Sequence, residues 1–317
     1  MDKNKFLFSI DPQTIRVETT PQFDVFIDGD SENSHIFIKA GDIFQTEQQT
    51  KIFSDDINLL YIRQNDKPRY YKYILTYLSD ITEDVLLQTA NKARVLHELI
   101  TFLSMTIFSS PSAKLITEFR KVIQLLTEFV IREEDAIKDL IHLTTSSFHL
   151  YNHVVNVGIF GLGLAREIIA DDSTCDMSEI SSGLFLHDIG RFTIPKYFNQ
   201  RNGPLSNDEW KVMKKHPEEG YKILDKFNTI SEEIKVIVLQ HHERNNGSGY
   251  PMSLRGNQIH MYSKICAISD TFDALTSYRP YRPAQSSFNA LAIMQNEMKG
   301  EFEPEFFARF VRLFSKQ

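Results

Sequence analysis

Among the residues between positions 153 and 270 of this 317-residue chain, five of the histidines and two of the aspartates form a set of types that bind divalent metals. They are His153, His187, Asp188, His216, His241, His242 and Asp270. Imidazole and carboxylate are ligands that divalent transition metals prefer, and seven of them exceed the needs of one tetrahedral ion. The set therefore predicts two adjacent metals, with a carboxylate available to bridge them. Two-metal sites of this kind hydrolyse phosphate esters.

The motifs around these residues form an ordered series. In chain order they are HVVNV at 153–157, HDIGRFTIP at 187–195, GPLSNDEW at 203–210, HPEEG at 216–220, HHERNNGSGYP at 241–251 and DTFDALTSYRPYR at 270–282. Over roughly residues 140–317 the chain resembles the HD-GYP family, cyclic-di-GMP phosphodiesterases within the HD-domain superfamily of metal phosphohydrolases. One His-Asp pair would indicate little, but chance is a poor explanation for an ordered series.

The resemblance implies how the seven ligands divide between two ions. The first ion would be held by four of them, His153, His187, Asp188 and Asp270. The second would be held by Asp188, His216, His241 and His242. Asp188 would then bridge the ions and orient a shared hydroxide, which is deprotonated near neutral pH and attacks phosphorus in line. Iron is the expected metal, with manganese as the alternative.

Five further side chains are predicted to contact the substrate. Arg191 stands where the family usually has lysine, and the resemblance implies a catalytic contact with the scissile phosphate, for which arginine offers a bidentate fork. Gly249 and Tyr250 belong to the GYP loop, where glycine permits close backbone approach and tyrosine offers an aromatic face. Arg279 and Arg282 match family positions that meet phosphates or guanine edges. A surface cation and a salt-bridged loop are the structural alternatives for the arginines.

Two positions near the motifs differ from the family pattern. Asn246 occupies a place where the family usually has aspartate, which indicates a change in how the loop is anchored. His149 occupies a place where some relatives have a glutamate that recruits a third metal. It lies four residues before His153, so a continuous helix would put both on one face. We interpret His149 as lying outside the ligand set. The remaining histidines considered, His35, His97, His142 and His260, are interpreted as hydrogen-bonded structural residues.

Composition narrows the classes of partner. A net charge of −7 and a pI near 5.8 argue against duplex nucleic acid, whose partners usually carry a basic face. Two cysteines suggest no disulfide framework. The longest apolar stretches, 95–108 and 154–165, fall short of the ~20 residues of a membrane span. The N-terminal apolar run is too short for a signal peptide, so a cytoplasmic protein is expected.

The elements that must position these residues change along the chain. Short β-prone runs separated by turn residues occupy 6–65, and helical periodicity begins near residue 70. The pattern predicts an α+β chain in which a small β-rich N-terminal domain precedes an all-α HD-type helical bundle. The predicted boundaries are 1–85 for a regulatory or sensor-like domain, 86–139 for connecting helices, and 140–317 for the HD-GYP catalytic domain. A simple packing domain remains the alternative for 1–85.

The resemblance implies a phosphodiesterase that opens cyclic-di-GMP to pGpG, with further cleavage to GMP left open. One alternative is an HD-type phosphohydrolase of another nucleotide. The other is a catalytically weak cyclic-di-GMP receptor that signals through protein contacts. The expected partner is cyclic-di-GMP or a related cyclic dinucleotide. A protein partner at the GYP loop or the N-terminal domain stays open, as do the sensed signal and the oligomeric state.

Overall fold

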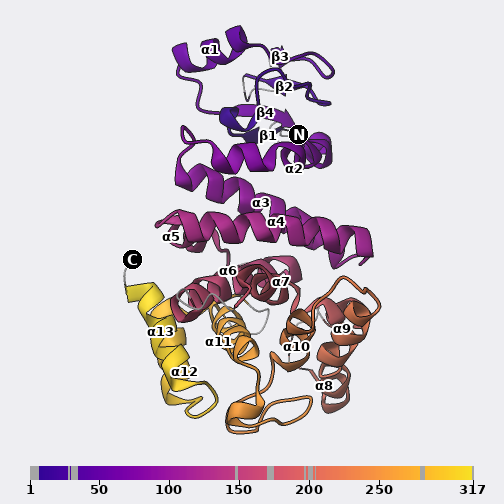
Figure 1. The fold of residues 1–317 in the computed structure, drawn as a ribbon, viewed down its shortest axis with the longest axis vertical. Helices are drawn as coiled ribbons and strands as arrows, with labels where there is room; N and C mark the ends of the chain where they lie inside the picture. The colour runs from indigo at the N-terminus through magenta and orange to yellow at the C-terminus, as the bar shows by residue number, and fades with distance from the viewer. Residues whose placement is uncertain are drawn as a thin grey trace. The chain divides into compact units, whose positions relative to one another are not determined.

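The computed structural model describes residues 7–27, 29, 35–146, 149–169, 175–195, 198, 203, 205–278 and 283–315. The chain divides into two compact units, Met1–Val95 and Leu96–Gln317, and the division falls inside helix α3 (Thr89–Ile107). Strands gather in the first unit, and helices joined by loops make up the described part of the second (Figure 1). The predicted fold class, a small β-rich N-terminal part followed by an all-α bundle, is confirmed.

Four short strands form the sheet of the first unit. They are β1 (Leu7–Ile10), β2 (Val25–Phe26), β3 (Ile36–Ile38) and β4 (Leu60–Arg63). The sheet is antiparallel with the order β1-β4-β2-β3. In β4, Leu60 and Ile62 are buried while Arg63 is exposed, as expected for a strand with one face on the core. Each strand overlaps one of the β-prone runs in the sequence.

A helix, α1 (Thr46–Ser54), interrupts the region in which the sequence pattern favoured strands. Its first turn consists of polar residues that favour helices, and the Gln48 side chain accepts a hydrogen bond from the Gln45 backbone N–H at 3.0 Å. Ile52 is its one buried residue, so hydrophobic periodicity gives almost no sign of this helix. Local capping therefore outweighs the β-prone surroundings here.

Aromatic residues build the core beneath the sheet. Helix α2 (Lys67–Glu83) contributes Tyr70 and Tyr73, which contact Phe23 edge-to-face with ring centroids 5.8 and 5.7 Å away. The Tyr73 hydroxyl accepts a hydrogen bond from the Arg16 backbone N–H at 2.8 Å and bonds the Thr19 hydroxyl at 2.6 Å. Burial raises the pKa of Tyr73, which keeps the hydroxyl protonated and available to both partners.

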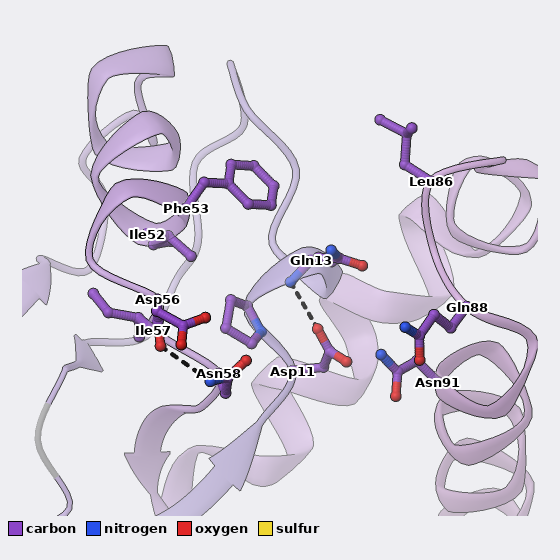
Figure 2. A pocket seen from close by; sticks show the side chains of 11 residues that line it. Asp11, Gln13, Ile52, Phe53, Asp56, Ile57, Asn58, Leu86, Gln88 and Asn91 are labelled. Carbon is purple, nitrogen blue, oxygen red and sulfur yellow. Dashed lines mark hydrogen bonds between the residues drawn. The ribbon is translucent and has the colours of Figure 1, made fainter.

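A cavity of about 270 Å³ lies within the first unit. Figure 2 shows that its walls come from the segments 11–13, 52–58 and 86–91. Four of the described lining residues carry side-chain amides: Gln13, Asn58, Gln88 and Asn91. Phe53 and Leu86, which are 58% and 81% exposed, also line it. The cavity is thus polar, with apolar side chains that reach solvent.

The described helices of the second unit after α3 carry the predicted ligands or lie next to them in the chain. They are α4 (Ala113–Arg132), α5 (Ala136–Leu143), α6 (Leu150–Ile169), α7 (Met177–Leu186), α8 (Asn207–Met213), α9 (His216–Asp225), α10 (Glu232–Gln240), α11 (Met261–Thr276), α12 (Ser287–Asn296) and α13 (Pro304–Ser315). Short 3₁₀ helices include η4 (Ile189–Thr193) and η6 (Gly256–Gln258). Among the described residues, no helix combines the length and apolar character needed to cross a membrane.

Helix α6 forms the centre of this unit. Its residues from 153 to 165 are buried on every side, and it packs against α5, α7, α11 and α13. A helix that is apolar all round belongs in a core rather than on a surface. Gly158 permits the close approach of α7, because a Cβ there would overlap the ring of Phe185. Phe185 in turn contacts Phe119 of α4 edge-to-face at 6.3 Å. These contacts hold α6, which carries His153, against α7, which is followed directly by His187 and Asp188.

Candidate metal centre

The seven predicted ligands converge from five places in the bundle. His153 lies on α6, Asp270 lies on α11, and the others lie at helix ends. Those at helix ends are His187 and Asp188 after α7, His216 at the start of α9, and His241 and His242 after α10. His242 is half-buried and the other six are buried. Residues more than 100 positions apart thus share one buried cluster.

Asp188 lies between two groups of histidines. Its Oδ1 atom is 3.2 Å from His216 Nε2 and 3.9 Å from His241 Nε2. Its Oδ2 atom is 3.4 Å from His153 Nε2 and 3.8 Å from His187 Nε2. The side chain is 3% exposed, so its charge faces imidazoles rather than water. The two oxygens face the two groups that the resemblance allots to separate ions.

Asp270 also spans the two groups. Its Oδ1 atom is 3.3 Å from His153 Nε2, and its Oδ2 atom is 3.4 Å from His242 Nδ1. The resemblance allots Asp270 and His153 to the first ion and His242 to the second. In this structure the carboxylate contacts one histidine of each group, so the cluster contains two carboxylates that reach both sides.

Three of the histidines are oriented by backbone carbonyls three residues earlier, each 2.8 Å from Nδ1: His187 by Leu184, His216 by Met213, and His241 by Val238. A carbonyl oxygen can only accept a hydrogen bond, so Nδ1 carries the proton and Nε2 keeps its lone pair. These Nε2 atoms are the ones that approach Asp188. The backbone therefore fixes both the tautomer and the direction of each ring.

The inward-facing nitrogens need an electrophilic partner. Nε2 of His216 and Nε2 of His241 lie 3.1 Å apart, and two lone pairs at that distance repel unless a cation lies beside them. Nε2 of His187 is buried and makes no hydrogen bond to any described residue. Buried polar atoms without partners are rare and call for an explanation. The residues present fit divalent metal ions, and they form two overlapping groups, Asp188 with His216, His241 and His242, and Asp188 with His153 and His187.

Burial keeps most of the imidazoles neutral. It lowers the pKa of His187, His216 and His242, and it lowers that of His241 to about 3. Neighbouring imidazoles add to the effect at His241. A metal would therefore displace no proton from these rings near neutral pH.

The carboxylates stay ionised despite burial. Desolvation opposes their charge, but for Asp188 the guanidinium of Arg191 and the ring of His216 hold the pKa well below its usual range. Hydrogen bonding to His153 does the same for Asp270. Burial alone would lower the pKa of His153, but nearby carboxylates together raise it well above its usual value. The cluster thus holds two ionised carboxylates at its centre, with Arg191 and His153 against them.

His153 is held by an aspartate to which the sequence analysis gave no role. Its Nδ1 atom lies 2.7 Å from Oδ2 of Asp273, which is 1% exposed. Oδ1 of Asp273 accepts hydrogen bonds from Asn156 Nδ2 at 2.7 Å and from Ser277 Oγ at 3.1 Å. The spacing of Asp270 and Asp273 places both on one face of α11, and an acidic residue inside an apolar helix is the signal that predicts such a partner.

Arg191 lies against the cluster on η4. Its Nη1 atom donates to Asp188 Oδ2 at 2.9 Å, and its side chain is 14% exposed. The guanidinium therefore offsets part of the charge of the central carboxylate. Its position at the edge of the predicted metal site is one from which a phosphate oxygen could be reached.

The GYP loop packs on the cluster through Tyr250. The Tyr250 ring stacks on His242 with centroids 4.6 Å apart and planes 28° apart, and its backbone N–H donates to His242 O at 3.2 Å. The Tyr250–Pro251 peptide is cis. Gly249 has a packing role, because a Cβ there would lie 2.5 Å from Arg244 N and from His242 O. The atoms that require a glycine here are therefore backbone atoms of the chain itself.

Glu243 anchors the same loop and was also given no role from sequence. It is 1% exposed and accepts hydrogen bonds from Met252 N at 2.7 Å and Leu254 N at 2.9 Å. Its one local signal is that an acid directly follows the paired histidines. Asn246, where the family usually has aspartate, accepts hydrogen bonds from Ser248 N and Ser248 Oγ and so stabilises a local turn.

Three positions considered from the sequence lie outside the cluster or outside the described residues. Arg279 and Arg282 lie outside the described residues, so their predicted substrate contacts stay predictions. His149 precedes α6 rather than sharing a helix face with His153, and its ring stacks on Tyr151 at 5.1 Å. His149 does not belong to either group of potential metal ligands among the described residues.

The fold and the cluster define an α-helical bundle with a buried histidine–carboxylate centre drawn from separate helices. Residues 140–306 match a family model described as "HD domain", and the chain belongs to this family. The resemblance to HD-GYP proteins that the motifs indicated is confirmed.

Two curated relatives are similar to about half of the chain. The chain is 33% identical over 183 residues to "Cyclic di-GMP phosphodiesterase PA4108" of Pseudomonas aeruginosa, with 58% of this chain and 44% of that protein covered. It is 36% identical over 162 residues to "Cyclic di-GMP phosphodiesterase response regulator RpfG" of Xanthomonas campestris pv. campestris, with 51% and 41% covered. The matched regions thus span less than half the length of either relative.

A solved structure supports the fold along nearly the whole chain. It is described as "Bd1817, a HDG"Y"P protein from Bdellovibrio bacteriovorus", and its TM-score is 0.69 at 17% identity. The similarity covers 98% of this chain and 99% of the other. At that identity the likeness concerns the fold.

Proposed function

We propose that the chain is a metal-dependent phosphodiesterase that hydrolyses cyclic-di-GMP to pGpG, with further cleavage to GMP left open. The observation that carries this proposal is Asp188, whose two oxygens face separate histidine groups within one buried cluster. A carboxylate shared between two ligand sets is the arrangement that two-metal phosphodiester hydrolysis needs. The names of the two curated relatives support the choice of substrate.

The proposed metals are two divalent transition ions, with iron expected and manganese as the alternative. One ion would take His153, His187 and Asp188, and the other would take Asp188, His216, His241 and His242. Asp270 would contribute an oxygen to either or both. When bound, two such cations would supply Lewis-acid charge to a phosphate and lower the pKa of water.

The chain's own residues would orient the ligands, bind the phosphate and shield the centre from solvent. Asp273 keeps the His153 ring in place through its 2.7 Å contact with Nδ1, so Nε2 faces the centre. Arg191 would bind non-bridging phosphate oxygens through its two-pronged donor set. Arginine stays protonated near neutral pH, so the proton for the leaving oxygen would come from another source, such as water. Tyr250 shields the His242 side of the centre from solvent.

A second function has one specific observation in its favour. Arg191 is already bonded to Asp188, and it replaces the usual lysine, so its availability to a phosphate depends on that bond. A catalytically weak receptor for the same nucleotide could function with Arg191 bonded to Asp188, because it would not need that arginine for hydrolysis. A hydrolase of another cyclic dinucleotide is the other alternative, because the cluster itself recognises phosphate rather than base.

The test is turnover of purified, metal-loaded protein on cyclic-di-GMP and related cyclic dinucleotides, with metals counted on the same samples. We expect about two metals per chain and hydrolysis of cyclic-di-GMP. Asp188→Asn should lower turnover at least ~100-fold, because an amide cannot give both ions full charge, while the far-ultraviolet circular dichroism stays unchanged. Asp208→Asn is the matched control, since Asp208 is an exposed aspartate of α8 paired with Lys211. Binding of the nucleotide by metal-loaded wild type without hydrolysis would favour the receptor.

We further propose that residues 1–85 form a regulatory or sensor-like domain, that 86–139 are connecting helices, and that 140–317 form the catalytic domain. The cavity in Figure 2 supports a sensing role over simple packing, because a domain kept for packing has no need of an amide-lined cavity. Its buried Asp11 is already bonded to Arg94 and to the Gln13 N–H. Asn58 Nδ2 donates to the Asp56 carbonyl oxygen and Asn91 Oδ1 accepts from Arg94 Nη2, so each of these two amides would offer its second polar atom to a small polar ligand.

Thermal-shift screening tests the sensing role. A ligand that binds only the folded state raises the melting temperature, and above the Kd the rise grows with the logarithm of its concentration. Small amines, amino acids and sugars would be screened against wild type and Asn58→Leu, which removes one amide of the cavity. A compound that stabilises wild type but not the variant supports the role. Equal responses of both proteins to every compound would contradict it.

A further inference from the structure

Beside the metal centre, three side chains form a group that no predicted role includes in full. Trp210 of α8 contacts the Tyr250 ring edge-to-face at 6.3 Å. The Lys214 ammonium lies 5.6 Å from the centroid of the Trp210 ring and 5.3 Å from that of the Tyr250 ring. Both distances fall within the range of cation–π attraction. We call Trp210, Lys214 and Tyr250 the aromatic–lysine group.

This group is joined directly to the cluster. The Tyr250 ring stacks on His242 and contacts the His216 ring edge-on at 6.5 Å. Lys214 lies two residues before His216, in the segment that leads from α8 to α9. Anything bound at the metals would therefore lie next to these rings.

Exposure makes the group unusual. Trp210 is 44% exposed, and Lys214 is exposed. A large aromatic side chain in water costs free energy, and when it lies beside a charged centre it marks a contact surface for a ligand. The Tyr250 ring, by contrast, is already covered by His242, so a base has less access to it than the sequence analysis expected. Trp210 has the larger accessible aromatic surface.

The charge of Lys214 is also available. No ion pair joins it to any described residue, whereas Arg191 is bonded to Asp188 and Lys211 to Asp208. An ammonium held beside two rings is kept near one place without being neutralised. It therefore suits a phosphate oxygen, for which a charge-assisted hydrogen bond is strong.

We infer that Trp210 and Lys214 form a nucleotide subsite, in which the indole stacks on one base of a cyclic dinucleotide and the ammonium binds one of its phosphates. The inference rests on the proposed function, because it adds a subsite for the same substrate. Bases stack on aromatic side chains with little regard to sequence, so Trp210 would contribute affinity while other residues select the base. The subsite would raise affinity and leave the chemistry at the metals unchanged.

The chain offers a direct probe, because Trp210 is its single tryptophan. Stacking on guanine quenches indole fluorescence. We expect rapid, saturable quenching when metal-loaded wild-type protein is mixed with cyclic-di-GMP in a stopped-flow instrument, before turnover begins. Absence of quenching at concentrations that saturate hydrolysis would overturn the role of Trp210.

Kinetics of matched variants test Lys214. Lys214→Met should raise the KM for cyclic-di-GMP and the Kd from quenching by about tenfold, with kcat within about twofold of wild type. Trp210→Leu should raise KM by about tenfold as well. Lys211→Met, on the same short helix but paired with Asp208, should behave as wild type. Hydrolysis of bis(p-nitrophenyl) phosphate, whose single phosphate would lie at the metals and leave none for Lys214, should change less than twofold in Lys214→Met and Lys211→Met.

The outcomes separate this inference from the proposed function. Wild type that hydrolyses cyclic-di-GMP while Lys214→Met has a normal KM would overturn the inference alone. A Lys214→Met variant that loses both substrates equally would assign Lys214 a structural role and also overturn it. Quenching without hydrolysis would support the subsite and contradict the phosphodiesterase. Wild type that neither binds nor cleaves cyclic dinucleotides would overturn both.

Discussion

His153 differs from its neighbours in how it is oriented. His187, His216 and His241 each donate Nδ1–H to a carbonyl oxygen, whereas Nδ1 of His153 contacts the carboxylate of Asp273. A carboxylate makes the ring more basic than a carbonyl does, and it raises the electron density at Nε2. His153 should therefore be the strongest imidazole donor of the set.

That difference leads to the first prediction, Asp273→Asn. The amide keeps the size of the side chain but loses the charge, and it can no longer accept from both His153 and Asn156. We expect metal affinity to fall about 10–100-fold, as is typical when the partner of a ligand histidine is removed. Competition with a chelator of known affinity measures the change. Asp225→Asn, which alters an exposed aspartate paired with Lys235, is the control. Unchanged affinity in Asp273→Asn would show that the carboxylate is dispensable.

Helix ends account for most of the cluster. The last carbonyls of a helix have no partner within the helix, and polar side chains usually satisfy them. Here Leu184 near the end of α7, Met213 at the end of α8 and Val238 near the end of α10 each accept from a predicted ligand histidine. One hydrogen bond thus serves two purposes, because it satisfies a helix end and directs a ring inward. Where these helices stop decides where the ligands point.

The approach of η4 to α9 is the second element on which the site depends. A Cβ at Gly190 would overlap the His216 carbonyl oxygen and lie 2.5 Å from Gly220 N. Both contacts are with backbone, which cannot move as a side chain can. Gly190→Ala should therefore push α9, and with it His216, away from Asp188. We expect a loss of about 3 kcal/mol in the free energy of unfolding and a reduced metal count.

Chemical denaturation and elemental analysis measure the two effects of Gly190→Ala. Gly163→Ala is the matched control, since its Cβ would approach the flexible Ile137 side chain at 3.3 Å. That control should lose far less stability and keep its metals. A Gly190→Ala protein with normal stability and metal content would show that η4 and α9 can separate without cost to the site.

At the scale of the whole molecule, the residues matched by the family model, 140–306, are fewer than those of the second compact unit, Leu96–Gln317. The match begins at residue 140, but α4 lies before it and packs on α7. Phe119 of α4 contacts Phe185, and Arg120 forms an ion pair with Glu179. The bundle that holds the cluster therefore extends upstream of the family motifs.

This extension predicts how the chain tolerates truncation. Residues 86–317 keep α3 and α4 entire, so we expect that fragment to be soluble and to bind about two metals, with altered regulation or oligomeric state. Residues 140–317 lose α4 and expose the α7 face around Phe185, so that fragment should melt at a clearly lower temperature or aggregate. Melting curves, light scattering and metal analysis compare them. Equal stability of the two fragments would show that α4 is not part of the bundle's core.

Stability should also depend on pH through His97 on α3. Burial lowers its pKa from 6.5 to about 4, so the unfolded chain takes up a proton there at a higher pH than the folded chain does. The stabilising contribution is complete above pH ~6.5 and is lost as the pH falls toward 4. Between pH 7 and pH 4, wild type should lose about 2 kcal/mol more than His97→Gln, which cannot titrate. Denaturant unfolding across this range measures it, and parallel profiles would contradict the assignment.

The sequence by itself determined the fold class, the family and the types of residue at the centre. These follow from short-range features, namely the change from strand to helix periodicity and six motifs whose residues are close in the chain. Dependence on short-range features also explains what could not be predicted from the sequence. Helix α1 escaped prediction because its one buried residue leaves almost no periodic signal, and the substrate contacts of Arg279 and Arg282 rest on the resemblance alone.

The tertiary structure decided what faces what. His153 and Asp273 are 120 positions apart, and no local pattern states that they meet. The same holds for the two-sided position of Asp270, for the stacking of Tyr250 on His242, and for the placement of Lys214 beside the rings of Trp210 and Tyr250. Such contacts depend on how helices pack, and packing is set by the volumes of many core side chains together rather than by any one motif.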